Sequence, residues 1–408
     1  MSKILYINCA CAGSTGKIIS DTVDFAVLKG YECVLCAPCN PGSNPNIRYI
    51  KTSLKGEQGL YRRLNRFYGY QYGFAPLSTG RIKRMIKKEK PDIVHIHCIN
   101  GYMVNIYSLF RFIKKHSIPT VVTNHAEFFY TGNCPLAYEC DRWKIGCGQC
   151  TRIHEATGGY HRDTTSKAWN MMKKAFSDMK SVVMTSVSPW VEGRAKQSPI
   201  VSGIPQEVVK NGVNTSIFTY QDPLAIRKKY GYSESAKIIF HPTANFSASE
   251  SDRKNGRYLI ALAESMREDN VMFVVAGRHS PGLQVPPNVV LLGLVSDQNA
   301  LAEYYAMADV TVVTGRQETF NMPVAESMCC GTPVVGFYAG GPESIAISKY
   351  SKFCEQGDMR ELEVAVRQMI AENYDKQMIS ECAKQEYAAE VMASKYMSIY
   401  DRLINNEG

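Results

Sequence analysis

An alternation of short apolar runs with helical patterns constrains the fold more than any other feature of the sequence. Runs of Val, Ile and other apolar residues recur at strand length, and amphipathic segments of helix length separate them. Continuous apolar strands joined through helices are typical of a parallel sheet that helices cover on both faces. The expected strands lie at 3–9, 32–37, 47–51, 92–98, 120–124 and 181–187, and then at 238–242, 271–276, 289–292, 310–314 and 333–337.

The strands fall into two series, and a turn-rich, charged passage at 215–235 separates them. The chain has 408 residues, which is the length of two domains. We therefore predict an α/β protein with two doubly wound, Rossmann-like parallel-sheet domains at 1–218 and 219–385, and a C-terminal helix at 386–408 that packs back on the first domain. Two such domains facing each other place a ligand cleft between the carboxyl ends of their strands.

The composition is that of an ordinary globular protein, with 45% hydrophobic residues, 21% charged residues and a net charge of +9. It excludes a disordered chain, a collagen and a coiled coil. The sequence has no apolar run of about 18 residues, and its start, MSKILYINCA, is too short for a signal peptide, so we expect a cytoplasmic protein. The chain contains 14 Cys, which favour reduced thiols or a metal site over a disulfide framework.

The segment 310–337 carries the strongest motif. A strand ends at Thr314, a polar loop follows, Pro323 lies at the start of a helix, and Gly331 follows its last residue. The helix N-terminus then opens at the carboxyl edge of the sheet, where its N–H groups suit a phosphate. Two carboxylates, Glu318 and Glu326, accompany it and are suited to ribose or sugar hydroxyls. The alternative is an ordinary loop with two surface Glu residues.

This motif resembles the signature of the retaining glycosyltransferases of family 4, which have the two-domain GT-B fold. The resemblance rests on the two Glu residues with seven residues between them, on Phe320 and Pro323, and on the following Cys-Gly-Thr-Pro-Val-Val. Further segments resemble the family in the same order along the chain: Lys210–Asn214, Ala276–His279, Leu292–Asp297, Tyr305–Asp309 and Gly340–Ser344.

The resemblance implies a donor site in the second domain. Arg253 and Lys254 match the basic pair that neutralises the donor diphosphate, although Asn255 intervenes before the glycine that usually follows directly. A fixed cationic clamp with a helix N-terminus stabilises the leaving diphosphate without a metal ion, so we expect no metal in catalysis. The alternative for the pair is a solvated basic turn.

The other donor contacts also follow from the resemblance. Glu326 matches the residue that binds the ribose hydroxyls, and Glu318 would lie near the donor sugar. The backbone N–H groups at Phe320, Asn321 and Met322 would hold the phosphates. Gly340 and Gly341 would let the backbone approach the donor.

In the first domain, a Gly-rich loop with Gly13 and Gly16 follows the first strand. It departs from the P-loop pattern and resembles the loop of the acceptor domain that faces the donor; a plain tight turn is the alternative. His125 follows the strand 120–124 and matches the active-site His of the family, whose next residue is often Asp and is Ala126 here. A structural His is the alternative for His125, and we expect His95 and His97, which share one face of a strand, to be structural.

A Cys-rich loop follows His125. Its last two Cys have the Cys-x2-Cys spacing of metal ligands, and four thiolates suit tetrahedral zinc. The sequence leaves three states open for the loop, namely a structural zinc site, free thiols and disulfides. The four candidate ligands are Cys134, Cys140, Cys147 and Cys150.

A basic segment at 61–90 is interleaved with Tyr and Phe. Such a surface suits peripheral contact with an anionic membrane or a lipid diphosphate acceptor, and a solvated helix with a Tyr-rich loop is the alternative. We expect no nucleic-acid partner, because the arrangement of strands and loops is that of a nucleotide-sugar enzyme. The cations are Arg62, Arg63, Arg66, Arg81, Lys83, Arg84, Lys87, Lys88 and Lys90.

These observations together predict a retaining glycosyltransferase with His125, Glu318, Arg253 and Lys254 in catalytic roles. The expected donor is a UDP- or GDP-sugar, and the expected acceptor is a glycan or a polyprenyl-diphosphate-linked glycan. The expected setting is bacterial capsule, O-antigen or exopolysaccharide assembly at the inner face of the cell membrane. A GT-B sugar-nucleotide epimerase and a non-catalytic nucleotide-binding scaffold are the alternatives.

Overall fold

The computed structural model describes residues 2–39, 42–158 and 162–405, and the chain divides into two compact units. The first unit comprises 1–210 and 392–408, and the second comprises 211–391. The sequence pattern predicts divisions at 218/219 and 385/386. The passage after residue 210 joins the second unit because Val213 pairs with the end of a helix there: its N–H donates to the Tyr387 carbonyl (2.7 Å), and the Ala389 N–H donates to the Val213 carbonyl (3.0 Å).

The first unit is built on a parallel sheet, which in the described residues has seven strands in the order β3-β2-β1-β4-β5-β6-β7. The six strands expected from the apolar runs are confirmed. The strand β7 is missing from the sequence expectation because it has only three residues, two of them polar. The bounds are β1 Lys3–Ile7, β2 Glu32–Ala37, β3 Arg48–Lys51, β4 Ile93–Ile96, β5 Thr120–Asn124, β6 Val182–Ser186 and β7 Gln206–Val208.

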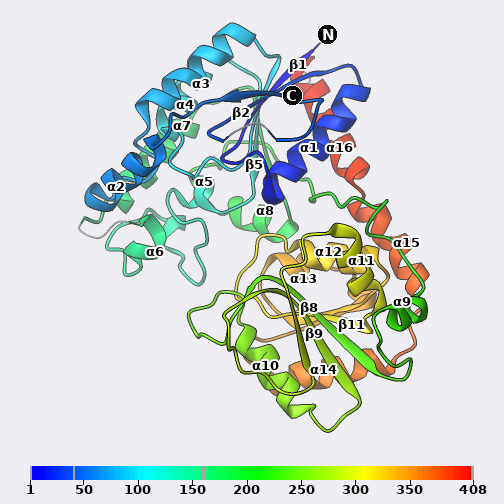
Figure 1. Cartoon of the computed structure of the whole chain (residues 1–408). Coiled ribbons are helices and arrows are strands. Elements are labelled where there is room, and N and C mark those ends of the chain that lie inside the picture. The colour runs from blue at the N-terminus through cyan, green and yellow to red at the C-terminus, as the bar shows by residue number, and fades with distance from the viewer. Residues whose placement is uncertain (1, 40–41, 159–161, 406–408) are drawn as a thin grey trace. The chain divides into compact units, whose positions relative to one another are not determined.

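Helices cover this sheet on both sides. One side packs against α1 and α16, whose residues Val23, Met392 and Tyr396 share a core with Ile4 and Leu35 of the strands. Figure 1 shows α3, α4 and α7 on the other side. The bounds are α1 Gly13–Leu28, α2 Glu57–Tyr68, α3 Pro76–Glu89, α4 Ile106–Lys115, α5 Phe128–Thr131, η1 Arg142–Lys144, α6 Ile153–Thr157, α7 Thr165–Phe176, α8 Pro189–Ala195 and α16 Ala389–Ile404.

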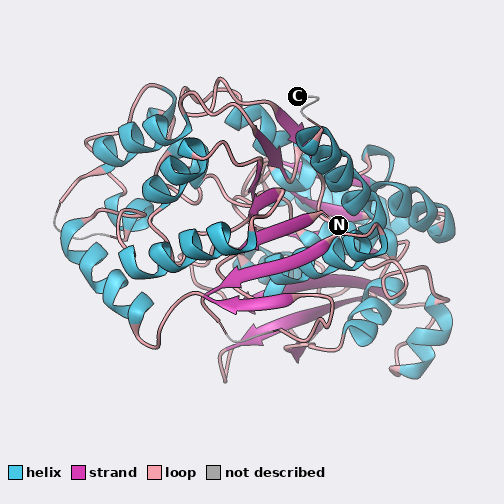
Figure 2. Ribbon diagram, turned by 90° about the horizontal axis from the view of Figure 1, so that it is seen from above, coloured by secondary structure: helices cyan, strands magenta, loops and turns pink. Residues whose placement is uncertain are grey.

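The second unit has the same architecture, with a parallel sheet in the order β10-β9-β8-β11-β12-β13 over the described residues. The five expected strands are confirmed, and β13 adds a sixth whose sequence, Ser-Lys-Phe-Cys, is short and half polar. The parallel arrows beside the N-terminus in Figure 2 show the corresponding arrangement in the first sheet. The bounds are β8 Lys237–Phe246, β9 Val271–His279, β10 Val289–Gly293, β11 Val310–Val313, β12 Val334–Phe337 and β13 Ser351–Cys354.

Two layers of helices enclose the second sheet (Figure 1). On one side α10 and α14 supply Leu259, Leu262, Leu362 and Val366 to the core. On the other side lie α11 and α12, with α9 packed on α11 and α15 packed on α12. The bounds are α9 Pro223–Lys229, α10 Gly256–Ser265, α11 Gln298–Met307, α12 Met322–Cys329, α13 Gly341–Ile345, η2 Ser348–Tyr350, α14 Met359–Ala371 and α15 Lys376–Tyr387.

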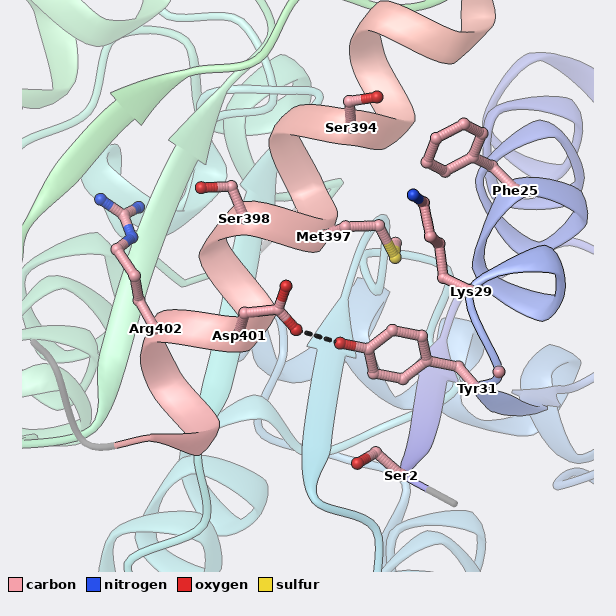
Figure 3. Close-up of a pocket in the computed structure, with 10 residues that line it drawn as sticks. Ser2, Phe25, Lys29, Tyr31, Ser394, Met397, Ser398, Asp401 and Arg402 are labelled. Carbon is pink, nitrogen blue, oxygen red and sulfur yellow. Dashed lines mark hydrogen bonds between the residues drawn. The ribbon is translucent and has the colours of Figure 1, made fainter.

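The apolar character of the helices and the position of one pocket both bear on where a ligand binds. Among the described helices, none combines the length and the apolar character needed to cross a membrane. A pocket of about 680 Å³ opens beside α16 (Figure 3), where the Tyr31 hydroxyl donates to the Asp401 carboxylate. Its lining residues Ser2 and Tyr31 directly precede β1 and β2, so the pocket lies at the amino edge of the first sheet. Ligands of doubly wound sheets bind at the carboxyl edge.

Candidate active site

In the second unit, three neighbouring strands each lead into a helix at the carboxyl edge. The helices α10, α12 and α13 follow β8, β11 and β12, which lie side by side in the middle of the sheet. Their N-termini therefore open at one edge, where a doubly wound sheet binds its ligand.

The way these helices begin singles out α10 and α12. The helices after the outer strands β10 and β13 are capped by side chains, because Asp297 accepts from the Asn299 N–H (3.0 Å) and Asp358 from the Glu361 N–H (2.9 Å). The helices α10 and α12 begin instead with an Asn in the left-handed region and have no side-chain cap. The side chains of these Asn residues therefore do not occupy the first N–H groups of the two helices, which suit an anion; further along, the Tyr258 and Val324 N–H groups donate to the Asn255 and Asn321 carbonyls (3.0 Å each).

The side chains of Asn255 and Asn321 do not cap their helices. Asn255 (φ 54°) donates from Nδ2 to the Thr314 carbonyl (3.3 Å), which ties the start of α10 to the end of β11. The Oδ1 of Asn321 (φ 75°) is buried and has no hydrogen-bond partner among the described residues. An unpaired buried acceptor at a helix start is costly unless a ligand or water donates to it.

The basic loop before α10 is bonded to the loop after β11. The Thr314 hydroxyl donates to the Lys254 carbonyl (2.7 Å), and the Arg316 N–H donates to the Arg253 carbonyl (3.0 Å). The Lys254 ammonium forms an ion pair with the Glu318 carboxylate. The structure thus brings together Lys254 and Glu318, which the sequence placed at one site, and leaves the Arg253 side chain exposed.

At Gly256 and Gly341 the backbone lies so close to a neighbouring segment that a side chain would collide with it. A Cβ at Gly256 would lie 2.7 Å from the Ser247 carbonyl oxygen, so α10 can begin against the end of β8 only with glycine there. A Cβ at Gly341 would lie 2.5 Å from the carbonyl carbon of Thr319. The backbone at Gly341 therefore approaches the neighbouring loop closely. Gly340 (φ 97°) supplies the left-handed turn beside it.

The loops after β11 and β12 are joined through their backbones. The Glu318 N–H donates to the Ala339 carbonyl (2.9 Å), and the Gly341 N–H donates to the Glu318 carbonyl (2.8 Å). Phe320, which belongs to the first of these loops, is buried. We call residues 318–320 together with 339–341 the paired loops. They hold the backbone of the predicted phosphate-binding residues in one arrangement.

Glu326 lies on α12 and is half-buried. Its Oε2 accepts a hydrogen bond from the Tyr305 hydroxyl (2.9 Å). Tyr305 on α11 is fully buried. No sequence signal pointed to this contact, because a Tyr in an amphipathic helix is ordinarily a core residue.

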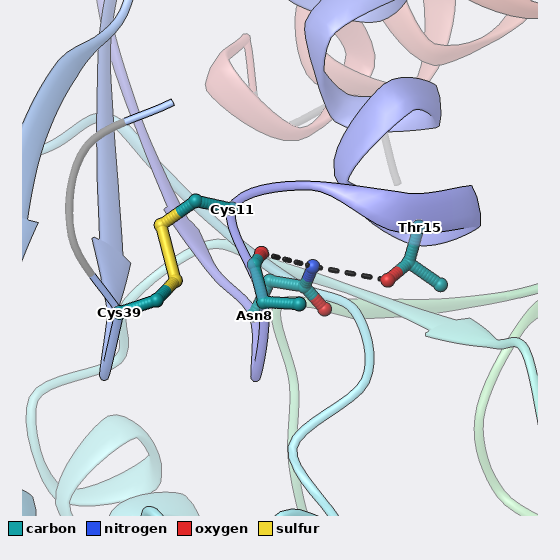
Figure 4. Close-up of a disulfide and its surroundings, with 5 residues drawn as sticks. Asn8, Cys11, Thr15 and Cys39 are labelled. Atoms are coloured by element: carbon teal, nitrogen blue, oxygen red, sulfur yellow. Dashed lines mark hydrogen bonds between the residues drawn. A yellow bond between two sulfur atoms is a disulfide. The ribbon is translucent and has the colours of Figure 1, made fainter. Parts of the chain in front are cut away.

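In the first unit, the Gly-rich loop opens α1 at the carboxyl edge of β1. Gly13 has φ 77°, and a Cβ at Gly16 would lie 2.8 Å from the carbonyl carbon of Cys11. The Asn8 Nδ2 donates to the Ala10 carbonyl (2.8 Å) and to the Thr15 hydroxyl (3.1 Å), which fixes the loop (Figure 4). The N-terminus of α1 has no side-chain cap.

The structure departs from the expectation of reduced thiols at one pair of cysteines. Cys11 and Cys39 form a disulfide with their Cα atoms 6.3 Å apart (Figure 4). They follow the adjacent strands β1 and β2, and the shared carboxyl edge brings them together. The other 12 cysteines are free, and Cys33 and Cys36 are buried thiols as expected, with burial raising the pKa of each to about 12.

The His residues form a stacked cluster at the ends of β4 and β5. The ring of His125 stacks on His97, with Nε2 of His125 2.9 Å from Nδ1 of His97. Burial lowers the pKa of His125 to about 4, so its imidazole is neutral near pH 7. His95 is a satisfied structural residue, as expected, because its ring nitrogens contact the Tyr400 hydroxyl (2.6 Å) and the Thr123 hydroxyl (2.7 Å).

The Cys-rich loop is anchored beside His125 by a buried carboxylate. Glu127 accepts from the Ala137 N–H (2.6 Å), the Tyr130 hydroxyl (2.8 Å) and Nε of Arg194 (2.6 Å). Glu127 is fully buried, so these three donors supply the stabilisation that a buried charge requires. The structure gives Glu127 the role of fixing the loop, and it adds Arg194, which the sequence did not indicate.

The four Cys of the Cys-rich loop are free thiols in the structure. In the chain from 2 to 405, outside the short undescribed gaps, no three His, Cys, Asp or Glu residues are positioned to hold a metal ion. The Cys147 thiol donates to the Thr131 carbonyl (3.7 Å), and burial and the neighbouring cysteines raise the pKa of Cys147 to about 12. Burial also raises the pKa of the Cys134 and Cys150 thiols, and zinc binding would release the protons of its cysteine ligands.

The zinc site stays a prediction and is tested directly. If the loop closes around zinc, elemental analysis of purified protein should find about one zinc per chain. Cys147→Ser should lose the metal and lower the melting temperature, because metal binding contributes to folding. Cys382→Ser, on α15, is the control and should keep the zinc. Folded, active, zinc-free protein from a zinc-replete culture would contradict the site.

The basic segment forms an exposed surface on α2 and α3. Arg62, Arg63 and Arg66 are exposed on α2, next to Phe67, which is 57% exposed, and Leu60, which is 55% exposed. Arg81 differs from them, because it is bound to the buried Glu57. We call the exposed part of α2 and α3 the basic-apolar surface; its members are Leu60, Arg62, Arg63, Arg66, Phe67, Tyr68, Leu77, Arg84, Lys87 and Lys88. Tyr61 and Tyr72 are buried and do not belong to it.

Two family models match the chain. The model described as Glycosyltransferase Family 4 matches residues 19–217, and the model described as Glycosyl transferases group 1 matches residues 242–372. The first match lies in the first unit except for its last seven residues, and the second match lies within the second unit.

Individual proteins and solved structures also match the chain. N-acetyl-alpha-D-glucosaminyl L-malate synthase of Bacillus anthracis is 26% identical over 49% of this chain, and the match spans 55% of that protein, about half its length. The putative colanic acid biosynthesis glycosyl transferase WcaC of Escherichia coli K12 is 20% identical over 77% of each chain. The structure of Anabaena Alr3699/HepE in complex with UDP matches at 13% identity with a TM-score of 0.66, over 97% of this chain and 98% of that one. The chain therefore belongs to the glycosyltransferases of family 4 and has the GT-B fold.

Proposed function

We propose that the protein transfers a sugar from a nucleoside diphosphate sugar to a glycan acceptor with retention of configuration. The observation that carries the proposal is the arrangement at the carboxyl edge of the second sheet. There α10 and α12 begin without side-chain caps, Asn321 has an unpaired buried oxygen, and the Lys254–Glu318 pair lies between the loops. The N–H groups and the ammonium suit a diphosphate, which brings negative charge and hydrogen-bond acceptors, and the Asn321 oxygen suits a hydroxyl donor of the sugar.

The chemistry needs charge stabilisation at the leaving group. The bond between the anomeric carbon and the diphosphate breaks, and negative charge grows on the leaving phosphate oxygen. Arg253, Lys254 and the N-terminus of α12 would stabilise that charge. Lys254 is paired with Glu318, so a bound diphosphate would share the ammonium with this carboxylate. Cations supplied by side chains make a divalent metal unnecessary in this proposal.

The remaining groups orient the donor. Glu326 accepts from the ribose hydroxyls, the N–H groups near Asn321 and Met322 hold the phosphates, and Glu318 faces the donor sugar. His125 belongs to the first unit and offers the sugar a neutral imidazole, because burial lowers its pKa to about 4. It therefore contributes hydrogen bonding and not a positive charge near pH 7.

The setting we propose is bacterial polysaccharide assembly, with a UDP- or GDP-sugar donor. The name of WcaC refers to colanic acid biosynthesis, which supports a glycan acceptor, and the solved HepE complex contains UDP. The name of the Bacillus anthracis relative refers to L-malate, which is not a glycan.

A donor screen tests the proposal. UDP-, GDP- and ADP-sugars are added separately to the protein in EDTA, and the melting temperature and the release of free sugar are measured. We expect one nucleotide class to raise the melting temperature and to be turned over without added metal. Activity below a tenth in EDTA that Mg²⁺ or Mn²⁺ restores would contradict the metal-independent mechanism. Conversion of the donor to an epimer would identify the epimerase alternative.

We further propose that the basic-apolar surface contacts an anionic membrane at its cytoplasmic face, where a polyprenyl-diphosphate-linked acceptor would be found. Apolar side chains beside Arg and Lys on a helix suit the interface of such a membrane. Changing Arg62, Arg63 and Arg66 together to Glu should weaken binding to vesicles of phosphatidylglycerol and phosphatidylethanolamine roughly a hundredfold or more, since each basic residue near the surface contributes about 1 kcal/mol.

A vesicle sedimentation assay measures this effect. The matched control changes three exposed cations of the second unit, Lys228, Arg267 and Arg360, to Glu and should bind vesicles like the wild type. Equal losses in the two triple variants would show a general charge effect and refute a localised membrane surface.

A further inference from the structure

The contact between Tyr305 and Glu326 joins the neighbouring helices α11 and α12 of the second unit. The Tyr305 hydroxyl on α11 donates to Oε2 of Glu326 on α12, at 2.9 Å. Tyr305 has no exposed surface, so its hydroxyl cannot exchange this partner for bulk water without local opening. Breaking the contact would therefore leave a buried hydroxyl without its partner, which is costly.

The ring of Tyr305 is fixed by aromatic packing. It meets Phe240 of β8 edge-on, with ring centroids 4.9 Å apart and planes at 87°, and it meets Phe218 at 6.1 Å and 68°. These contacts place the ring between a central strand of the sheet and the chain before α9. The hydroxyl at the end of the ring consequently has a set position.

The backbone of Tyr305 is fixed as well. Its carbonyl accepts from the Thr332 hydroxyl (2.7 Å), and that hydroxyl accepts from the Lys376 ammonium (3.0 Å). The same ammonium donates to the carbonyls of Ala306 (3.0 Å) and Ala308. Lys376 is thus committed to the C-terminal end of α11, the end at which Tyr305 lies.

The proton on Tyr305 stays in place. Burial and the adjacent Glu326 carboxylate raise the pKa of the Tyr305 hydroxyl well above its ordinary value, so the group is a donor across the working pH range. Because the Tyr305 hydroxyl donates its proton to one oxygen of the Glu326 carboxylate, it limits the rotation of that carboxylate. Glu326 then meets a ligand in one orientation, which removes part of the entropy cost of binding.

We propose that Tyr305 is the positioning residue that holds Glu326 in the orientation required for the ribose hydroxyls of the donor. The inference rests on the proposed role of Glu326 and deepens it, because it assigns part of the nucleotide affinity to a side chain that does not touch the nucleotide. Tyr305→Phe removes only the hydroxyl and keeps the ring that packs on Phe240.

Calorimetric titration with UDP and GDP, and with their 2′,3′-dideoxy forms, tests the inference on the full chain. With the nucleotide that binds, we expect Tyr305→Phe to weaken the ribose form roughly three- to tenfold, the range of one hydrogen bond, and to leave the dideoxy form unchanged. In a Glu326→Ala background the same change should have no further effect, because the carboxylate that it orients is gone.

The neighbouring Tyr304 gives the matched control. It lies on the same helix and stacks on Tyr230 with ring centroids 4.8 Å apart, so Tyr304→Phe should leave both affinities at the wild-type level. Equal losses for the ribose and dideoxy forms in Tyr305→Phe, or a loss added to that of Glu326→Ala, would overturn the inference and leave a structural role. Wild-type affinity in Tyr305→Phe while Glu326→Ala binds weakly would overturn it too. Wild-type affinity in Glu326→Ala would instead remove the ribose assignment itself.

Discussion

Replacing Arg253 and Lys254 together with Ala is expected to lower kcat by roughly a hundred- to a thousandfold, the range seen when a donor to a developing anion is removed. Both cations face charge that increases as the diphosphate leaves, so their loss affects the transition state more than the bound donor. Nucleoside diphosphate affinity should fall less, by roughly tenfold, since the helix N-termini continue to bind the phosphates.

Steady-state kinetics and calorimetry on the double variant separate the two effects. Arg257→Ala is the matched control, because Arg257 lies one turn further along and forms an ion pair with the exposed Glu250 at 2.8 Å. The control should keep wild-type kcat. If kcat and affinity fall by the same factor in the double variant, the pair serves binding alone and the proposed leaving-group role is wrong.

Glu326→Ala should weaken the nucleoside diphosphate roughly ten- to a hundredfold, or about 1.5–3 kcal/mol, the value of a charge-assisted hydrogen bond. The ribose is held alike before and during the reaction, so kcat should change little while kcat/KM falls with the affinity. Calorimetric titration with the nucleoside diphosphate measures the effect.

The variant should fold, because Glu326 is only half-buried and the neighbouring Ala325 and Ser327 remain in the core. Glu268→Ala, at an exposed position of the same unit, is the control for loss of a negative charge. Unchanged nucleotide affinity in Glu326→Ala with an intact thermal melt would remove the ribose assignment.

Much of the fold can be predicted from the sequence, because the buried parallel strands are continuous runs of Val and Ile. The strands β7 and β13 were not predictable in this way. Their segments, Gln-Glu-Val and Ser-Lys-Phe-Cys, are short and partly polar, and they become strands only because they extend the edge of a sheet already formed. Edge strands depend on their neighbours more than on their own composition.

The candidate site was predictable where a motif fixes local geometry and less so where distant segments meet. Glu318 and Lys254 lie 64 residues apart, and the resemblance alone placed them at one site, where the structure pairs them. No local pattern relates Tyr305 to Glu326, Arg194 to Glu127, or Cys11 to Cys39. Each of these contacts depends on which elements become neighbours in the sheet and its helix layers, and sequence periodicity does not encode that choice.

The paired loops have a consequence for hydrogen exchange. The amides of Glu318 and Gly341 donate across the pair, one in each direction, so neither is exposed to solvent until the two loops separate. Both should then exchange through one shared local opening, with the same free energy. A nucleotide that binds to either loop alone would slow exchange in both. A loosened glycine turn after β12 would likewise make the phosphate-binding backbone after β11 more mobile, although no residue there had changed.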